Sequence, residues 1–507
     1  MNMKRTLNIM LLALLAVPVA AQETYENAKL ATEDLNGTAR YVGMGGAMEA
    51  LGADISTIST NPAGIGLFRR SSASASVGFI NQEGAKSFGG GHTTNVSFDQ
   101  VGFVWTNQIS STDFVNFAFN YHKSRNFNQI LSAADRLNRA SQNKLTANKF
   151  AEGYLYDGDK QLLSCSLLDE IYDEVLNNLQ NPGSKDWHYM EADRYALDRR
   201  HTGYIGEYDF NLSGNVDNSF YWGITLGLHD VHYTHYGEYS ENLVDYEFSP
   251  AVISDDRTVT GQGADLKLGV IFRPIEESPL RFGVSVVTPT WYNLRTSNYT
   301  RYDDLNYYAD GRDNYEFKLY TPWKFGLSAG HTIGQYLAMG LSYEFTDYTN
   351  LDSREAYTDD WGDDASESDK MMNLHTSKTL KGVSTVKAGV EFKPDPALAV
   401  RLGYNYVSPM YEKDGFKDGC ISSVGSNVSS ATDFVNWGAT HRITCGLGYQ
   451  SSNWNLSVAY QYAMQKGDFA PFYSETFASE PVFDNVADMV KVDNKRHQLL
   501  FTATYSF

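Results

Sequence analysis

Apolar residues recur at every second position along much of the chain after Arg70, and this alternation constrains the fold more than any other feature. Successive side chains of a β-strand point to opposite faces, so such a pattern predicts strands with one apolar and one polar face. The pattern also holds over 337–346 and 498–507, where Leu500 is the one apolar residue on the polar face. Between Trp454 and Tyr462, the apolar face carries Trp454, Leu456, Val458, Tyr460 and Tyr462, and the other face carries Asn455, Ser457, Ala459 and Gln461.

The lengths of the connections decide between a soluble β-sandwich and a membrane barrel. Short turns such as 110–112 and 451–453 alternate strictly with long polar loops, as in outer-membrane barrels with tight periplasmic turns and long external loops. A soluble sandwich gives no reason for this rhythm. About fourteen strands are predicted, each long enough for the ~9–11 tilted residues that cross a bilayer. They lie near 72–80, 95–106, 113–123, 203–213, 219–235, 258–273, 279–296, 315–333, 335–347, 379–393, 397–409, 440–450, 454–466 and 493–507.

The sequence therefore predicts an all-β fold, a transmembrane antiparallel β-barrel over residues 71–507, in the outer membrane of a cell. The mean hydropathy of −0.39 does not oppose this, because such a barrel carries its apolar surface in alternate positions. Residues 1–21 have the charged start, short apolar run and small-residue end of a secretory signal peptide, so the mature chain is expected to begin near Gln22.

Charge and cysteine content limit the partners. A net charge of −20 excludes a nucleic-acid role, which needs a basic face. Acidic residues gather in one predicted loop, which we interpret as solvated, with divalent-cation bridging to lipopolysaccharide or a weak Ca²⁺ site as the alternative. They are Asp359, Asp360, Asp363, Asp364, Glu367 and Asp369. Of the three cysteines, Cys445 falls in a predicted strand, whereas Cys165 and Cys420 fall in outer loops and could pair in an oxidising compartment.

The longest connection, residues 124–201, is predicted to be a partly helical extracellular loop. Apolar residues recur there at helical spacing, and the run from Ile130 to Phe150 is also compatible with a helix. One interpretation is a cap that packs on itself. The other is an apolar landing site at the barrel mouth, where a lipophilic ligand first leaves water. The candidate ligand residues on this stripe are Leu163, Leu167, Leu168, Ile171 and Val175.

Motifs for catalysis or metal binding are weak. On a strand, His232 points away from His229 and His235, which share a face but lie about 20 Å apart, so we predict no metal site and no cofactor. The chain carries no hydrolase, metalloprotease, paired Cys-x-x-Cys or phosphate-loop motif, and we predict no enzyme. Inward-facing cations indicate either a wet interior or a partner for a ligand carboxylate. Arg281, Arg401 and Arg442 are the candidates for the second role.

Residues 39–67 lie between the signal peptide and the strands, with too many glycines for a stable helix and no period-2 run. Asn61-Pro62 initiates a turn, and Gly64 and Gly66 permit unusual backbone angles. We therefore expect a compact plug made of turns. The segment resembles the N-terminal hatch of the FadL/TodX family of outer-membrane transporters for hydrophobic compounds. The matching blocks are Ala39-Arg40, Gly43-Met44-Gly45-Gly46-Ala47, Ala53-Asp54-Ile55-Ser56 and Asn61-Pro62-Ala63-Gly64.

This resemblance implies a barrel plugged by a hatch over residues 22–70, with Asn61, Pro62, Ala63 and Gly64 at the gate. It implies passive uptake of hydrophobic molecules, above all long-chain fatty acids. The terminal aromatic Phe507 resembles the signal read by the barrel-assembly machinery. The kinked third strand of the family is not visible here, and the nearest irregularity is a predicted β-bulge at Asp99-Gln100.

Two alternative functions stay open from the sequence. A barrel of the same family could serve as a protein-binding component of a secretion or surface-assembly system, with its long loops as docking surfaces. Haem uptake is a third, which rests only on the three histidines.

Overall fold

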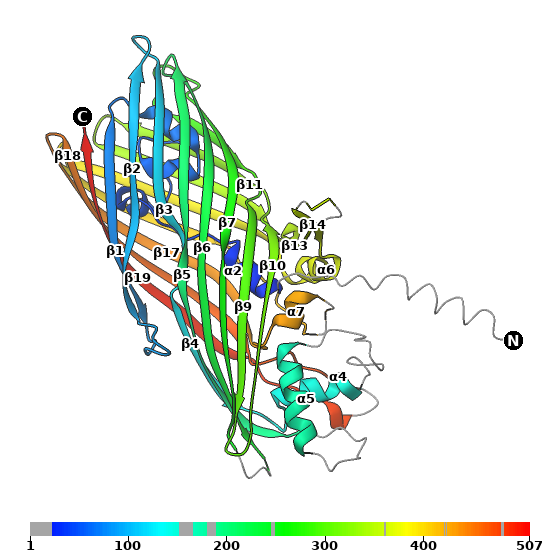
Figure 1. Cartoon of the computed structure of the whole chain (residues 1–507). Coiled ribbons are helices and arrows are strands. Elements are labelled where there is room, and N and C mark those ends of the chain that lie inside the picture. The colour runs from blue at the N-terminus through cyan, green and yellow to red at the C-terminus, as the bar shows by residue number, and fades with distance from the viewer. Residues whose placement is uncertain are drawn as a thin grey trace.

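In the described part of the chain, nineteen strand segments pair antiparallel into one closed sheet, in which β1 pairs with both β2 and β19 (Figure 1). The computed structural model describes residues 23–151, 166–179, 189–244, 249–358, 361–362, 364–419, 421, 423–477 and 481–507. The predicted signal peptide and the residues Leu163, Cys165, Cys420, Asp359, Asp360 and Asp363 lie outside these ranges.

Each strand that crosses the barrel wall is called a stave here. Five staves are interrupted and consist of two consecutive segments each, so the nineteen segments form a barrel of fourteen staves, as the sequence predicts. These are β3 with β4, β8 with β9, β10 with β11, β12 with β13, and β14 with β15, because each pair shares its neighbours in the sheet. The segments are β1 (Ser72–Glu83), β2 (Thr94–Gln108), β3 (Phe114–Asn126), β4 (Gln129–Arg136), β5 (Ala192–Val216), β6 (Phe220–Leu243), β7 (Ala251–Phe272), β8 (Arg281–Val287), β9 (Trp291–Asp303), β10 (Tyr308–Tyr320), β11 (Lys324–Ile333), β12 (Leu337–Asp347), β13 (Asp352–Thr358), β14 (Asp364–Ser368), β15 (Gly382–Asp395), β16 (Leu398–Val407), β17 (Phe434–Ser451), β18 (Trp454–Ala470) and β19 (Val490–Ser506).

The outer surface of the barrel is an apolar band, formed by the alternate residues of the strands. Leu500, the exception to the alternation, points inward and packs against Val42 of the N-terminal segment. An apolar exterior around a closed barrel is the surface that contacts lipid in an outer membrane. Exposed members of this band include Phe79, Phe103, Trp105, Phe117, Leu212, Leu226, Leu268, Val284, Leu327, Leu341, Leu402, Leu447 and Leu456.

The third stave corrects two predictions. The run from Ile130 to Phe150 is not one helix, because residues 129–136 form β4 and pair with β5, so the barrel wall continues into the predicted loop 124–201. The register of β3 with β5 shifts between Lys123 and Arg125, an irregularity that the sequence pattern did not indicate. The predicted bulge in β2 is confirmed, since Ser76 pairs with Gln100 and Val77 with Phe98, which leaves Asp99 as the extra residue.

Helices lie inside the barrel and at one of its ends (Figure 1). The helices α4 and α5 gather at the end opposite the C-terminus, and α2 lies within the barrel. Among the described residues, no helix is both long and apolar enough to cross a membrane. The helical segments are α2 (Thr24–Leu30), α3 (Ala39–Gly43), η1 (Ile55–Ser59), η2 (Pro62–Leu67), α4 (Gln142–Ala151), α5 (Leu167–Leu179), η3 (Tyr348–Asn350), α6 (Lys370–Thr379), α7 (Val424–Val428) and η4 (Pro481–Phe483).

Candidate functional site: the hatch and the lumen

The segment from Glu23 to Arg70, called the hatch here, fills the lumen with short helices and turns. Asn61 caps η2: its Oδ1 accepts a hydrogen bond from the Ala63 N–H at 3.1 Å, and its Nδ2 donates to the Val270 carbonyl on β7 at 3.4 Å. Asn61 therefore holds both its own turn and the barrel wall, as an Asn before Pro in a turn is suited to do. Pro62, Ala63 and Gly64 are buried behind it.

Glycines of the barrel wall let this turn approach the sheet closely. A Cβ at Gly269 would lie 2.1 Å from Asn61 Oδ1, and one at Gly223 would lie 2.4 Å from the Pro62 carbonyl carbon. Gly223 and Gly269 are direct cross-strand partners on β6 and β7. The Asn61–Pro62 turn thus rests on a wall without side chains at the point of contact.

A second set of glycines supports residues 44–51 of the hatch. Gly330, Gly340, Gly389 and Gly403 are consecutive cross-strand partners on β11, β12, β15 and β16, and so form one continuous ladder. A Cβ at Gly340 would lie 1.8 Å from the Ala47 carbonyl oxygen. Because the obstacle is backbone, no side-chain rotation could relieve the clash. The hatch is therefore seated on the wall by backbone contact over four neighbouring strands.

Ion pairs and hydrogen bonds add to this seating, and the three candidate arginines all take part in hatch contacts. Arg281 donates to the Leu51 carbonyl at 3.0 Å. Arg401 donates to Glu391 at 2.7 Å, and the hatch residue Arg40 binds the same carboxylate. Arg442 lies 3.8 Å from Asp34 of the hatch. The three arginines lie at separate hatch contacts and do not form one cluster.

Asp34 is the centre of a cationic group that the sequence did not reveal. Its Oδ1 lies 3.0 Å from Arg125 Nη1 and 3.8 Å from Arg442 Nη2, and its Oδ2 lies 3.9 Å from Arg496 Nη1. Burial alone would raise the pKa of the Asp34 carboxyl, but the three guanidinium groups outweigh burial and hold the pKa below its usual range. The three arginines come from β3, β17 and β19, so no sequence spacing links them.

A cavity of about 260 Å³ lies beside Asp34, between the hatch and the wall. Its lining is amphipathic, with Arg125, Arg442 and Arg496 on the cationic part. The apolar part includes Leu35, Ile80, Phe127, Val407, Trp437 and Met464. Such a space matches a molecule with an apolar body and an anionic head.

The outer half of the lumen holds α2. Glu23 caps this helix, and Thr24 Oγ1 lies 2.9 Å from His375 Nδ1 on α6. Tyr25 stacks on Tyr411 with ring centroids 5.0 Å apart and donates its hydroxyl to Asn436 at 2.7 Å. The start of the described chain is thus fixed by neighbours on α6, on β17 and in the connection between β16 and β17.

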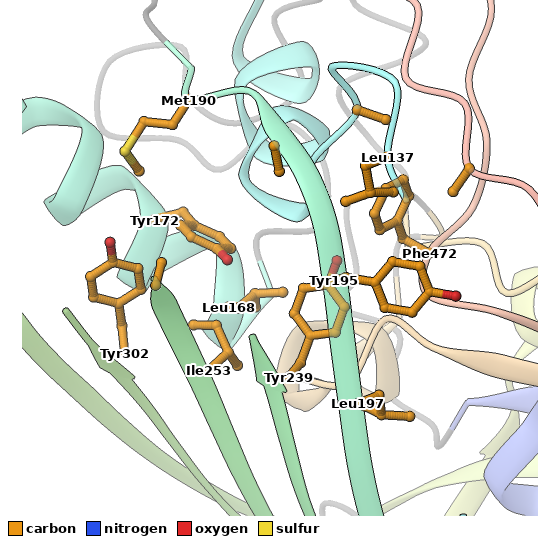
Figure 2. Close-up of a cluster of buried hydrophobic side chains, with 14 of the residues drawn as sticks. Leu137, Leu168, Tyr172, Met190, Tyr195, Leu197, Tyr239, Ile253, Tyr302 and Phe472 are labelled. Atoms are coloured by element: carbon orange, nitrogen blue, oxygen red, sulfur yellow. The ribbon is translucent and has the colours of Figure 1, made fainter. Parts of the chain in front are cut away.

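The predicted apolar helix of the long loop is present as α5 and packs over the outer end of the barrel. Leu167, Leu168, Ile171 and Val175 are all buried. Figure 2 shows Leu168 and Tyr172 of α5 near Ile253, Tyr239 and Tyr302 of the barrel strands. The apolar stripe is therefore covered by the barrel rim, which favours the interpretation as a cap.

The acidic loop differs in part from the prediction. Asp369 is not a solvated loop residue: it is fully buried and caps α6, because its Oδ1 accepts from the Met372 N–H at 2.9 Å.

The three histidines lie as the strand period predicts. His229 and His235 are buried on the inner face of β6, whereas the side chain of His232 is 47% exposed. His229 nevertheless has polar neighbours from other strands. His122, Glu207 and Asp209 each offer one potential metal-ligand atom, and these atoms lie within 4.8 Å of one another.

Fold and site together define a plugged outer-membrane β-barrel. Two crystal structures share this fold. One is a FadL homologue of Pseudomonas aeruginosa, 12% identical, covering 94% of this chain and 100% of that one, with a TM-score of 0.51. The other is the toluene transporter TodX of P. putida, 10% identical, covering 94% of this chain and 99% of that one, with a TM-score of 0.50. The chain therefore has the fold of the FadL-type barrels. No family model and no curated protein matches the sequence.

Proposed function

We propose that this protein takes up hydrophobic molecules passively across the outer membrane, with long-chain fatty acids as the principal substrates. The observation that carries the proposal is the amphipathic cavity beside Asp34. Its arginines suit a carboxylate head group, because a guanidinium can bind a carboxylate with two parallel hydrogen bonds. Its apolar lining suits an acyl chain, for which each buried CH₂ contributes about 0.8 kcal/mol.

The plugged barrel also accounts for the direction of transport. In an open aqueous pore a fatty acid stays in water and gains no apolar contact. An apolar site that releases its ligand toward the periplasm lets the molecule move inward down its concentration gradient. The hatch fills the lumen, so passage requires part of it to move. We propose that Asn61, Pro62, Ala63 and Gly64 form the gate, because the side-chain hydrogen bond described between this turn and the wall is a long one, from Asn61 to the Val270 carbonyl at 3.4 Å. Residues 45–51, in contrast, are bound by Arg281, Asn405 and Lys387 of the wall.

Uptake of a labelled long-chain fatty acid by cells expressing the Arg442→Gln variant tests the substrate. We expect uptake to fall about tenfold, the loss of one charge-assisted hydrogen bond to an anion. Arg194→Gln is the matched control, since Arg194 is an exposed residue at the outer end of β5. TodX is a toluene transporter, so labelled toluene is the second probe. A loss of both uptakes to the same degree would contradict the role of Arg442 in head-group binding.

Deletion of residues 61–63 tests the gate. Strand pairing begins only at Ser72, so the barrel should still assemble and shift in SDS gels on heating. Fatty-acid uptake should change, and wild-type uptake would show that this turn is not the gate. If uptake in every variant equals that of cells without the protein, the alternative role as a protein-binding component of a secretion system gains support.

A further inference from the structure

Four buried side chains of three neighbouring strands lie next to one another on the lumen wall. His122 of β3, Glu207 of β5 and His229 of β6 form a cross-strand row, in which each residue is the direct partner of the next. Asp209 lies two residues further along β5, on the same face. All four are more than nine-tenths buried.

The polar atoms of this group face one another at distances too long for hydrogen bonds. His122 Nε2 lies 3.6 Å and His229 Nδ1 lies 3.9 Å from Glu207 Oε2, while His122 Nδ1 lies 3.7 Å from Asp209 Oδ2. Neither Asp209 Oδ2 nor His229 Nδ1 has a hydrogen-bond partner among the described residues. Two ligands of a tetrahedral zinc ion lie about 3.4 Å apart, so these three contacts need only a small contraction, whereas His229 must also approach His122 and Asp209.

His229 has the second contact that metal-bound histidines usually make. Its Nε2 lies 2.9 Å from Asp265 Oδ2, and because a carboxylate only accepts, Nε2 carries the proton. The lone pair of the neutral ring is then on Nδ1, the atom directed at Glu207. A carboxylate that orients a histidine in this way also strengthens it as a ligand.

The carboxylates of the group outnumber its one ammonium, so a further cation would compensate their charge. Lys267 forms ion pairs with Glu207 Oε1 at 2.8 Å, Asp209 Oδ1 at 3.0 Å and Asp265 Oδ1 at 2.6 Å. With all three carboxylates ionised, one ammonium leaves two negative charges, which are costly to bury without compensation. Lys267 pairs with one carboxylate oxygen of Glu207 and one of Asp209, and the second oxygen of each carboxylate faces the histidines.

We propose that His122, Glu207 and Asp209 bind one divalent transition-metal ion, and that His229, whose Nδ1 lies 3.9 Å from Glu207 Oε2, moves in as the fourth ligand when the ion binds. Zinc is the best match to two imidazoles and two carboxylates. One such ion neutralises the group. It also fastens β3, β5 and β6 to one another beside Thr32 and Glu33 of the hatch, which line both the cavity that His122 lines and the cavity that His229 lines.

Zinc binding to the purified full-length protein in detergent tests the proposal. After removal of metals with a chelator and reloading with Zn²⁺, elemental analysis should give about one zinc per chain, and zinc should raise the unfolding temperature. Asp209→Asn and His229→Gln should each weaken zinc binding by at least about tenfold, and Asp265→Asn by about tenfold through the orientation of His229. His235→Gln is the matched control: His235 is a buried inward histidine of β6 that pairs with Asp255 instead.

If the variants fail to assemble, X-ray absorption of the zinc-loaded wild type decides, with nitrogen and oxygen ligands at about 2.0–2.2 Å expected and no sulfur. Less than about a tenth of an equivalent of zinc in the wild type, or equal binding by wild type and Asp209→Asn, would overturn the proposal. In that case protons on the histidines balance the charge. None of these readouts depends on transport.

Discussion

Arg40 of the hatch binds Glu391 of β15 with two hydrogen bonds, from Nε at 3.0 Å and from Nη2 at 3.2 Å. Arg401 of β16 donates to the same carboxylate at 2.7 Å. Glu391 thus joins the plug to two strands of the wall, and both oxygens of its buried carboxylate are used. A bidentate pair of this kind fixes orientation as well as distance.

The Glu391→Gln variant should loosen the hatch without unfolding the barrel. It leaves two guanidinium groups without their anion, which weakens hatch seating by about 3–5 kcal/mol. Hydrogen–deuterium exchange of residues 39–52 should speed up, while resistance to SDS at room temperature is kept. Glu412→Gln is the control, because Glu412 forms a half-exposed pair with Lys381 and should change nothing. Unchanged exchange in Glu391→Gln would show that backbone contact alone holds the hatch.

Gly340→Ala tests that backbone contact. The added Cβ would meet the Ala47 carbonyl oxygen at 1.8 Å, so residues 44–51 must move away from the wall. We expect a leaking barrel, measured as increased sensitivity of cells to a large hydrophilic antibiotic. Gly438→Ala is the control on β17, since a Cβ there would meet only the Lys466 carbonyl oxygen, at 3.1 Å. Equal sensitivity of both variants would contradict the seating by glycines.

Those features of the fold that depend on local periodicity could be predicted from the sequence. The two-residue alternation and the connection lengths predicted the barrel, and a change of parity in β2 predicted the bulge at Asp99. Leu500 broke the alternation because it packs against Val42, a contact that the strand pattern does not contain.

Features that depend on long-range contact could not be predicted. Residues 129–136 have a helix-compatible pattern, but pairing with β5 makes them a strand. Of the arginines around Asp34, Arg125 lies more than 300 residues before Arg442 and Arg496 in the chain, so only the closed barrel brings them together. Inward glycines were a signal that sequence reasoning missed: they recur on the polar face of several strands, where a plug that contacts the wall by its backbone requires them.

Val175→Asp tests the role of α5 as a cap. Val175 is 1% exposed in the apolar cluster at the barrel rim, so a carboxylate there costs packing and desolvation, about 3 kcal/mol or more. We expect faster proteolysis of the long loop in intact cells, with the barrel still heat-modifiable. Glu170→Gln changes an exposed residue of the same helix and should not alter proteolysis. If Val175→Asp abolishes fatty-acid uptake while the loop stays resistant, a direct contact of α5 with the ligand is favoured over a cap.

The Asp34 carboxyl should hold the hatch over a wide range of pH and release it only in acid. Its ordinary pKa is 3.8, and Arg125, Arg496 and Arg442 hold the pKa in the folded protein below that value, although burial alone would raise it. A carboxyl whose pKa is lowered on folding stabilises the folded state at every pH above its ordinary pKa, and this contribution is lost as the pH falls through the lowered value. The amides of residues 28–36, after correction for the intrinsic pH dependence of exchange, should therefore be equally protected from hydrogen exchange from neutral pH down to about pH 4 and lose protection only below it.

Asp34→Asn should show weaker protection at neutral pH and no acid step, because the amide carries no charge to lose. Asp493→Asn, which removes an exposed partner of Lys495, should behave as the wild type does. An acid step that begins well above pH 4, or that persists in Asp34→Asn, would show that another group controls this part of the hatch.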